Sequence, residues 1–294
     1  MTEPIYYGGQ AVIEGVMMRG RKAMVTVVRR PGGGLATSTQ PLSPLYTGRL
    51  RQTPLFRGVI VLIEAMSLGL NALLYSANVF TEEEEKPVSN ATLWPMVGVA
   101  LLFAVALFFV APLFLTRLAN AYLQTSLLFN LVEGVIRLII FVAYLRLVAL
   151  LPDLQRVFAY HGAEHKTVNA YENGVPLEVD SVRKFDTAHV RCGTSFLFIV
   201  MVISIVVFSV VGLPSLWLMV LSRVVLIPVI AGISYEITYF GARHTGNVLV
   251  RAVLAPGLWL QSLTTREPDD SQLEVAVAAM KKVTEIDQAE QPAA

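Results

Sequence analysis

The sequence predicts a mainly α-helical membrane protein with about four transmembrane helices in two hairpins, additional interfacial helices and a small N-terminal β-rich cytoplasmic module. Of the 294 residues, 54% are hydrophobic and only 15% are charged, and the mean hydropathy is +0.59. A soluble domain carries roughly a quarter charged residues, so this composition favours a bilayer. Apolar segments long enough to cross a membrane recur along the chain, and an alternating β-branched pattern precedes them.

The charge balance and the cysteine content exclude several classes of protein. The 23 Lys and Arg residues nearly balance the 22 Asp and Glu residues, so the net charge of +1 argues against specific DNA binding through a broad basic surface. The single cysteine, Cys192, excludes an intramolecular disulfide framework and a cysteine-rich zinc module. Three of the four histidines lie close together in the sequence, at His161, His165 and His189.

Residues 1–53 are expected to form the β-rich module. Two apolar runs, 10–18 and 23–28, are rich in β-branched residues and are followed by the turn sequence Pro31-Gly-Gly-Gly34.

Residues 54–91 are expected to contain an interfacial helix and an acidic linker. The run 58–77 has the length to cross, but the distribution of basic residues and its one charge, Glu64, favour a helix on the membrane surface. The acidic run at 82–85 fits a solvated linker, with a docking surface for a basic partner as the alternative.

Two hairpins are predicted, at residues 92–151 and 195–241. The first contains the uncharged run 93–116, which exceeds the ~20 residues needed to cross a membrane, and a second helix over 127–151. The second contains residues 195–213 and 224–241, separated by a break at Pro214. Three intramembrane polar residues are candidates for function or for structural ion pairs: Glu133, Arg137 and Glu236. Each such charge costs about 2.5–3.5 kcal/mol to insert, and Glu133 and Arg137 are one helical turn apart.

The distribution of Lys and Arg orients these hairpins. Nine basic residues precede the first span, five lie in residues 152–194, and five follow the fourth span. The two remaining connections hold only Arg117 and Arg223. By the positive-inside rule, both termini and the central loop are expected to be cytoplasmic. If residues 58–77 crossed the membrane, the central loop would instead lie outside.

The central segment, residues 152–194, combines a helix and a loop with the histidine cluster. Helical spacing extends over 151–171, and Asn173-Gly174 is expected to end the helix. His161 and His165 then share one helix face, about 6 Å apart along the axis. The run His161-Gly-Ala-Glu-His165 matches the H-x-x-E-H order of inverted zincins. In such a site the two histidines bind a divalent metal ion, most often zinc, and Glu164 acts as the general base.

A catalytic zinc requires a third protein ligand, and four residues are near enough in sequence. They are Glu172, Asp186, His189 and Cys192. Glu172 lies about 10 Å beyond His165 in helical rise, which disfavours a shared ion. His189 and Cys192 stand three residues apart just before the third span, at the same membrane surface. The alternatives are that the histidines cap or pack and that Cys192 is a small buried residue at a helix start.

Residues 242–294 are expected to comprise an interfacial segment and a C-terminal amphipathic helix with a disordered tail. Arg251 and Pro256 within the short apolar run 247–262 favour an interfacial or re-entrant segment. Ser271 and Glu274 have the spacing of a capping box, which predicts the start of the final helix. The last ten residues are typical of a disordered tail.

Several motifs together resemble one known family. They are Gly8-Gly-Gln-Ala-Val-Ile-Glu-Gly-Val-Met-Met-Arg19, His161-Gly-Ala-Glu-His-Lys-Thr167, Arg191-Cys-Gly-Thr-Ser-Phe196, Ala255-Pro-Gly-Leu-Trp-Leu-Gln261 and Thr264-Thr-Arg-Glu-Pro-Asp269. The chain thereby resembles the YqhQ-like bacterial family, domain of unknown function 1385. The resemblance implies a multi-pass protein of the bacterial cytoplasmic membrane, described as a predicted metal-dependent enzyme. By motif matching, its polar constellation comprises His161, Glu164, His165, His189 and Cys192.

Three functional hypotheses follow. The first is a membrane-embedded, metal-dependent hydrolase with its ion at the cytoplasmic surface of the lipid bilayer. The second is a non-enzymatic scaffold that docks a cytoplasmic protein, the ribosome or the membrane-insertion machinery through a basic cluster: Arg19, Arg21, Lys22, Arg29 and Arg30. The third is a transporter that uses the intramembrane charges, which with four spans would require a homo-oligomer. The first hypothesis is favoured, without a named substrate.

Overall fold

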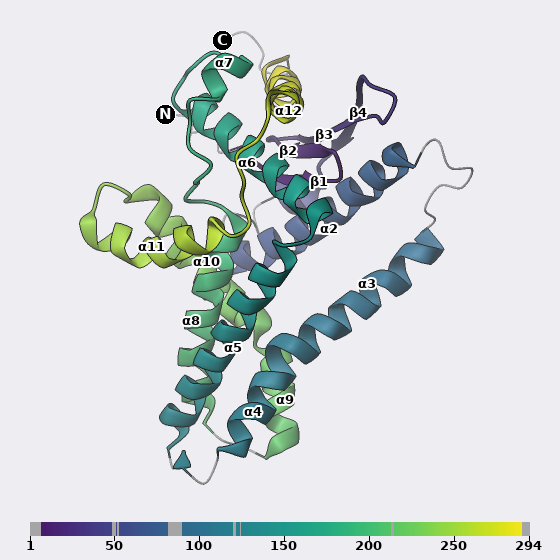
Figure 1. Cartoon of the computed structure of the whole chain (residues 1–294). Helices are drawn as coiled ribbons and strands as arrows, with labels where there is room; N and C mark the ends of the chain where they lie inside the picture. The colour runs from purple at the N-terminus through teal and green to yellow at the C-terminus, as the bar shows by residue number, and fades with distance from the viewer. Residues whose placement is uncertain are drawn as a thin grey trace.

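The computed structural model describes residues 7–48, 51, 53–81, 90–119, 122–123, 125–212 and 215–289. A head that contains a β-sheet sits at one end of a set of long apolar helices (Figure 1). The fold class is confirmed: the chain is mostly helical, with helices of membrane-crossing length and a small N-terminal sheet. The predicted acidic linker at 82–86 and residues 290–294 of the predicted tail lie outside the described residues.

Four antiparallel strands form the sheet in sequence order: β1 (Gly8–Val12), β2 (Gly15–Arg19), β3 (Ala23–Arg29) and β4 (Leu35–Pro41). β1 and β2 are joined by a two-residue turn in which Glu14 adopts a φ of +50°. Between β3 and β4, Gly33 and Gly34 adopt φ values of +91° and +80°. Side chains disfavour this left-handed region, so the glycine run permits the turn. The predicted β-module is therefore present.

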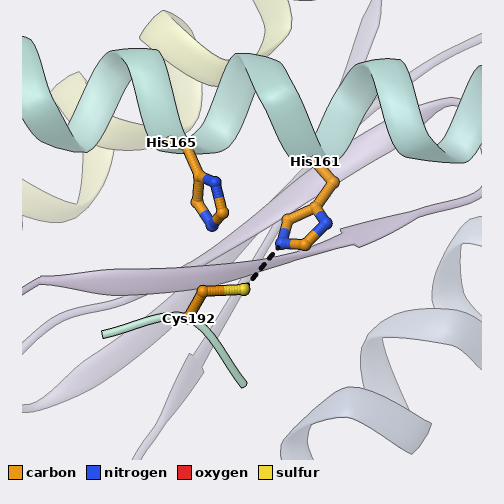
Figure 2. A group of neighbouring side chains, drawn as sticks. All are labelled: His161, His165 and Cys192. Carbon is orange, nitrogen blue, oxygen red and sulfur yellow. Dashed lines mark hydrogen bonds between the residues drawn. The ribbon is translucent and has the colours of Figure 1, made fainter. Parts of the chain in front are cut away.

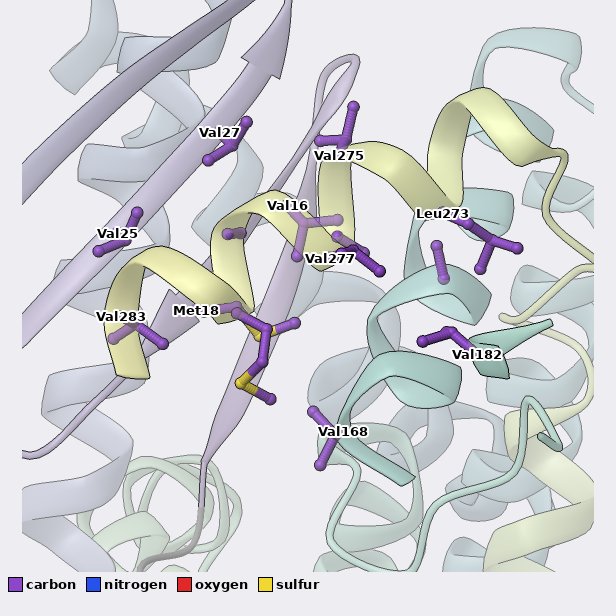
Figure 3. Packing of buried hydrophobic residues seen from close by; sticks show 14 of the residues in the cluster. Val16, Met18, Val25, Val27, Val168, Val182, Leu273, Val275, Val277 and Val283 are labelled. Atoms are coloured by element: carbon purple, nitrogen blue, oxygen red, sulfur yellow. The ribbon is translucent and has the colours of Figure 1, made fainter. Parts of the chain in front are cut away.

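The sheet is the middle layer of a three-layer head, because alternate residues of each strand point to opposite faces. Val16, Met18 and Val25 join a core with helices α6 (Pro152–Glu172) and α12 (Asp270–Ala289) (Figure 3). On the other face, Met17 and Met24 pack with residues of α2 (Phe56–Phe80) and with the turn of helix α1 (Pro44–Thr47). Helix α2 therefore forms part of the head through one of its sides.

Helix α12 begins two residues earlier than the predicted capping box. Asp269 Oδ1 accepts from the backbone N–H of Gln272 at 3.0 Å, and Gln272 Oε1 accepts from the backbone N–H of Asp269 at 3.0 Å. The reciprocal cap thus joins Asp269 and Gln272, and the assignment to Ser271 and Glu274 was wrong. Glu274 instead accepts from Arg29 of the sheet at 2.6 Å. The helix continues to Ala289, so the first half of the predicted tail is helical.

The central segment folds as its spacing predicts. Pro152 lies in the first turn of α6, where its missing N–H removes no helical bond. The helix ends at Glu172, and Gly174 follows with a φ of +67°. A short helix, α7 (Val179–Val182), then leads to the loop that carries His189 and Cys192.

The long apolar helices make up the rest of the molecule. They are α3 (Asn90–Val105), which continues through a π-helical turn η2 (Ala106–Val110) into α4 (Ala111–Leu118), then α5 (Ser126–Val148), α8 (Gly193–Val211), α9 (Leu216–Val225), α10 (Ile227–Arg243) and the shorter α11 (Val248–Gln261). Within the described residues, four helices are long and apolar enough to cross a membrane: α2, the segment Trp94–Leu118, α5 and α8.

The bounds predicted for the last span differ from those of the helices in this region. Helices α9 and α10 form a pair bent by 46°, which would be a fifth candidate span if it crosses as one unit. Pro228 lies in the first turn of α10 and cannot donate to the preceding helix, which accounts for the break. As one unit, the pair would begin a span near Leu216, eight residues before the predicted start, and Arg223 lies within α9 instead of in a connection between helices.

Candidate metal centre

Helix α6 directs His161 and His165 from one face toward the loop before α8 (Figure 2). Their ring centroids are 4.3 Å apart. His161 Nδ1 lies 2.8 Å from the carbonyl oxygen of Thr264, and His165 Nδ1 lies 2.6 Å from that of Thr187. A carbonyl oxygen can only accept, so each Nδ1 carries the proton and each Nε2 of a neutral ring keeps its lone pair. Both imidazoles are thus held in the tautomer and orientation that a metal ligand needs.

Cys192 completes a three-residue group with these histidines. It caps the N-terminus of α8, where its Sγ accepts from the backbone N–H of Thr194 at 3.4 Å. The Sγ atom is 3.3 Å from His161 Nε2. Burial alone would raise the pKa of the Cys192 thiol, but this pKa is lowered overall, in part because the backbone N–H of Thr194 donates to the sulfur. A lowered pKa favours the thiolate, the form that binds metals.

The distances in this group fit one metal ion after a small contraction. One ligand atom each from His161, His165 and Cys192 can be chosen so that all three lie within 4.8 Å of one another. Zinc bonds imidazole nitrogen at about 2.0–2.1 Å and thiolate sulfur at about 2.3 Å, so tetrahedral ligand atoms lie roughly 3.3–3.8 Å apart. Two nitrogens and one sulfur are also the donor types that zinc prefers.

Glu164 lies beside the group on the same helix. Its side chain is buried, with the residue 4% exposed, and its Oε2 lies 3.4 Å from His165 Nε2. Strand β1 packs closely on it, because a Cβ added to Gly9 would come within 2.8 Å of Glu164 Cγ. The carboxylate therefore borders the metal-ligand group without replacing one of its three members.

The other three candidate ligands point elsewhere. His189 Nε2 is 3.5 Å from Glu172 Oε2, and Glu172 also accepts from Arg191. Asp186 Oδ1 accepts from the backbone N–H of Ala188 at 3.1 Å. Burial lowers the pKa of His189 against the opposing charge of Glu164, which favours a neutral ring. Among the four residues considered from sequence, Cys192 is the one that converges with His161 and His165.

A cavity of about 330 Å³ is lined in part by His161, His165 and Cys192. Its lining also contains Arg19 of β2, Glu64 of α2, and Arg51, which precedes α2 in the chain. Arg19 Nε donates to Glu64 Oε1 at 3.0 Å, and Arg51 donates to Glu64 Oε2. Sequence reasoning did not assign these residues to the site. The sequence feature that could have indicated them is Glu64, because a lone carboxylate in an apolar helix requires a partner of opposite charge.

The N-terminal basic cluster does not present one continuous surface. Arg19 pairs with Glu64 inside the cavity, whereas Arg29 pairs with Glu274 of α12. Two members of the cluster are therefore bound to carboxylates of the same chain, each in a different place. This arrangement argues against the hypothesis that the cluster forms one docking surface for a large polyanion.

A second polar group lies among the long helices. Glu133 of α5 pairs with Arg137, as their spacing predicts, and also with Arg223 of α9 at 2.5 Å. Arg137 Nε donates to the carbonyl oxygen of Phe108 at 3.0 Å. Pro112 has no N–H to donate to that carbonyl four residues earlier, so Arg137 satisfies it instead. The prediction that Arg223 lies in a connection between spans was wrong, since this residue lies within α9 and is only 1% exposed.

Glu236 belongs to a different contact from Glu133 and Arg137. It accepts from Arg57 Nε at 2.7 Å and from the backbone N–H of Leu55 at 3.0 Å, where α10 meets the start of α2. Its side chain is 26% exposed. The three predicted intramembrane polar residues therefore form two separate groups.

Gly162 within the histidine motif allows the close approach that orients His161. A Cβ at this position would come within 2.1 Å of the carbonyl oxygen of Arg266, two residues after Thr264. We expect Gly162→Ala to displace that segment and with it the Thr264 carbonyl, weakening metal binding by about 10- to 100-fold, as for other losses of a ligand-orienting bond. Metal titration by calorimetry measures this. Gly98→Ala is the control, since its Cβ would meet open space, and equal affinities for the two variants would contradict the expectation.

The similarity of the chain to known proteins extends over almost its whole length. The family described as "Protein of unknown function (DUF1385)" matches residues 53–286. The "Uncharacterized protein YqhQ" of Bacillus subtilis (strain 168) is 34% identical over 300 residues, which cover 97% of this chain and 94% of that protein. No solved structure matches the chain. The family match includes His161, His165 and Cys192.

Proposed function

The chain belongs to the DUF1385 family, and from this premise we propose that it is a membrane-embedded, metal-dependent hydrolase whose ion is held by His161, His165 and Cys192. One observation carries the proposal. Both Nδ1 atoms are bound to backbone carbonyls, so two Nε2 lone pairs and the Cys192 sulfur converge at one cavity wall. A purely structural histidine pair does not require this common orientation. Zinc is the ion that best fits two nitrogens and one thiolate.

The side chains around the group have separable roles in this proposal. A divalent ion at this position would supply Lewis acidity and would lower the pKa of a water molecule. Glu164 Oε2 would accept the proton that this water molecule loses, since it is a buried carboxylate oxygen 3.4 Å from His165 Nε2. Gly9 of β1 permits the strand to hold the Glu164 side chain in place. His161 and His165 hold their positions through the Thr264 and Thr187 carbonyls.

We place this site at the cytoplasmic face of a bacterial membrane, with both termini on that side. The sheet, α6 and α12 share one core, so the chain must cross the membrane an even number of times between each of them. The α3–α4 segment with α5 supplies one pair of crossings, and α8 with the α9–α10 pair supplies the second. This count leaves α2 lying on the membrane surface. The many Lys and Arg residues of the head segments support the cytoplasmic side.

Elemental analysis tests the metal centre directly. We expect the full-length protein, purified in mild detergent without chelators, to contain about one equivalent of zinc per chain or to take it up on titration. Absence of stoichiometric binding of zinc, iron and manganese would overturn the proposal.

Glu164→Gln separates hydrolysis from metal binding. This variant should keep the metal, because Glu164 is not one of the three ligands, but should lose about 10²- to 10⁴-fold in hydrolytic rate with loss of the base. p-Nitrophenyl acetate and p-nitrophenyl phosphate, as simple carboxylic and phosphoric esters, provide the assays. A metal-loaded wild type without activity on either, or an equally active Glu164→Gln variant, would argue against the assigned chemistry.

A further inference from the structure

The cavity that faces the metal-ligand group carries an excess of positive charge. Among the described residues that line it, four arginines stand against two glutamates, Glu64 and Glu164, and one of the arginines, Arg191, pairs with Glu172 outside the lining. The arginines come from four different parts of the chain: Arg19, Arg51, Arg191 and Arg243. Folding has therefore gathered cations from segments that are far apart in sequence, and a bound metal ion would add to their charge.

The excess of positive charge is clearest around Glu64, which pairs with two arginines. Arg19 and Arg51 both donate to this one carboxylate, and their side chains are only 20% and 26% exposed. Burial and the neighbouring charge of Arg19 lower the pKa of Arg51 to about 10. Two guanidinium groups therefore share the Glu64 carboxylate in a confined space, and the charge of Asp287, which does not line the cavity, also acts on Arg19. An additional anion in the cavity would relieve their repulsion.

The remaining walls of the cavity are apolar and aromatic, which favours an anion that also has an apolar part. Val61, Ala65 and Leu68 of α2 line the cavity together with Tyr235 and Tyr239 of α10. The outward side of α2 is also apolar: Ile63 and Met66 are 46% and 60% exposed. In the proposed topology this outward side lies in the membrane, so one cavity wall is the helix that separates the cavity from lipid.

We propose that the cavity binds the phosphate group of an amphiphile, with Arg19 and Arg51 as the phosphate-binding pair. Guanidinium groups match phosphate oxygens in geometry and form strong charge-assisted hydrogen bonds with them. The apolar wall and the neighbouring membrane favour a lipid headgroup over a free phosphate. This inference deepens the proposed function, on which it rests, by assigning the substrate class that the metal centre faces.

Binding of short-chain lipids to the full-length, metal-loaded protein tests this inference. The probes are dihexanoyl phosphatidic acid, dihexanoyl phosphatidylcholine and inorganic phosphate, titrated calorimetrically into protein in dodecyl maltoside. We expect phosphatidic acid to bind at least about 10-fold more tightly than either comparison. Arg51→Gln should weaken its binding by about 10- to 100-fold, the range for loss of one charge-assisted hydrogen bond.

The variant and its control are matched. Arg51→Gln leaves Arg19 and Glu64 as a balanced pair, so the fold and the metal content should be retained. Arg29→Gln removes an arginine of β3 that pairs with Glu274 of α12 and does not line the cavity, so phosphatidic acid affinity should be unchanged. A circular dichroism spectrum and the metal content of each sample accompany the titration.

The outcomes distinguish this inference from the proposed function. Metal-loaded wild type that fails to bind phosphatidic acid, or equal binding by the wild type and Arg51→Gln, overturns the phosphate site and leaves the metal centre intact. Inorganic phosphate that binds as tightly as phosphatidic acid supports the phosphate site and overturns its lipid source. Protein that takes up no metal overturns the proposed function, whichever lipid result accompanies it.

Discussion

Full-length protein that carries His165→Ala should bind zinc at least about 100-fold more weakly than the wild type. Loss of an outer-shell partner typically costs 10- to 100-fold in affinity, and here a ligand itself is removed. Two of the three converging atoms would remain, which is too few for a stable zinc site in a protein. The measurement is competition with a chromophoric chelator, together with the metal content of the purified protein.

Two further histidine variants make this result specific. His244→Ala is the general control, because His244 lies at the end of α10 with its Nδ1 2.9 Å from the carbonyl oxygen of Phe240, away from the group. His189→Ala should also retain the metal, since its Nε2 faces Glu172 and Arg191. If His189→Ala lost the metal and Cys192→Ala kept it, the assignment of the third ligand would be wrong.

Glu133→Gln should destabilise the helical bundle by about 3–5 kcal/mol. Glu133 is 1% exposed and is the carboxylate that both Arg137 and Arg223 contact. Removal of one partner from a buried ion pair leaves uncompensated charge, and this cost exceeds the net value of the intact pair. In this protein two guanidinium groups would lose their counter-charge together. Denaturant-induced unfolding in mixed micelles measures the change in the free energy of unfolding.

Glu236→Gln is the matched control for that experiment. It too removes a helical carboxylate that pairs with an arginine, but its side chain is 26% exposed, so we expect a loss of at most about 1 kcal/mol. Arg223→Met should also cost less than Glu133→Gln, because it leaves Glu133 and Arg137 as a balanced pair. Similar losses in all three variants would show that the charge balance is not what stabilises the bundle.

Much of the candidate metal centre could be predicted from local sequence. The spacing of His161 and His165 on a helix already places both rings on one face, and this geometry depends on α6 alone. The choice of Cys192 over His189 could not be predicted, because it depends on how the loop before α8 returns to α6. The partners of the Nδ1 atoms, Thr187 and Thr264, also come from other segments.

Periodicity was less informative where one segment serves two environments. The run that became α2 has the length of a span, and its sheet-facing side, with Leu68 and Ala72, is as apolar as its exposed side, with Met66 and Leu73. Hydropathy cannot distinguish a protein core from lipid, since both exclude water. The prediction for Arg223 is wrong for a related reason: a charged residue is expected to end a span, whereas Glu133 compensates this charge among the helices.

The sequence by itself determined the helical membrane class, the presence of an N-terminal β-rich module and the histidine pair, because periodicity, turn residues and spacing act over a few neighbouring residues. Only the tertiary structure decided that Arg19, Arg51 and Glu64 face His161, His165 and Cys192 across one cavity. The two sets of residues are at least 97 positions apart in the sequence, and their interactions depend on distance and burial in the folded chain. The chemistry of each side chain is therefore local, whereas the composition of the site is a property of the fold.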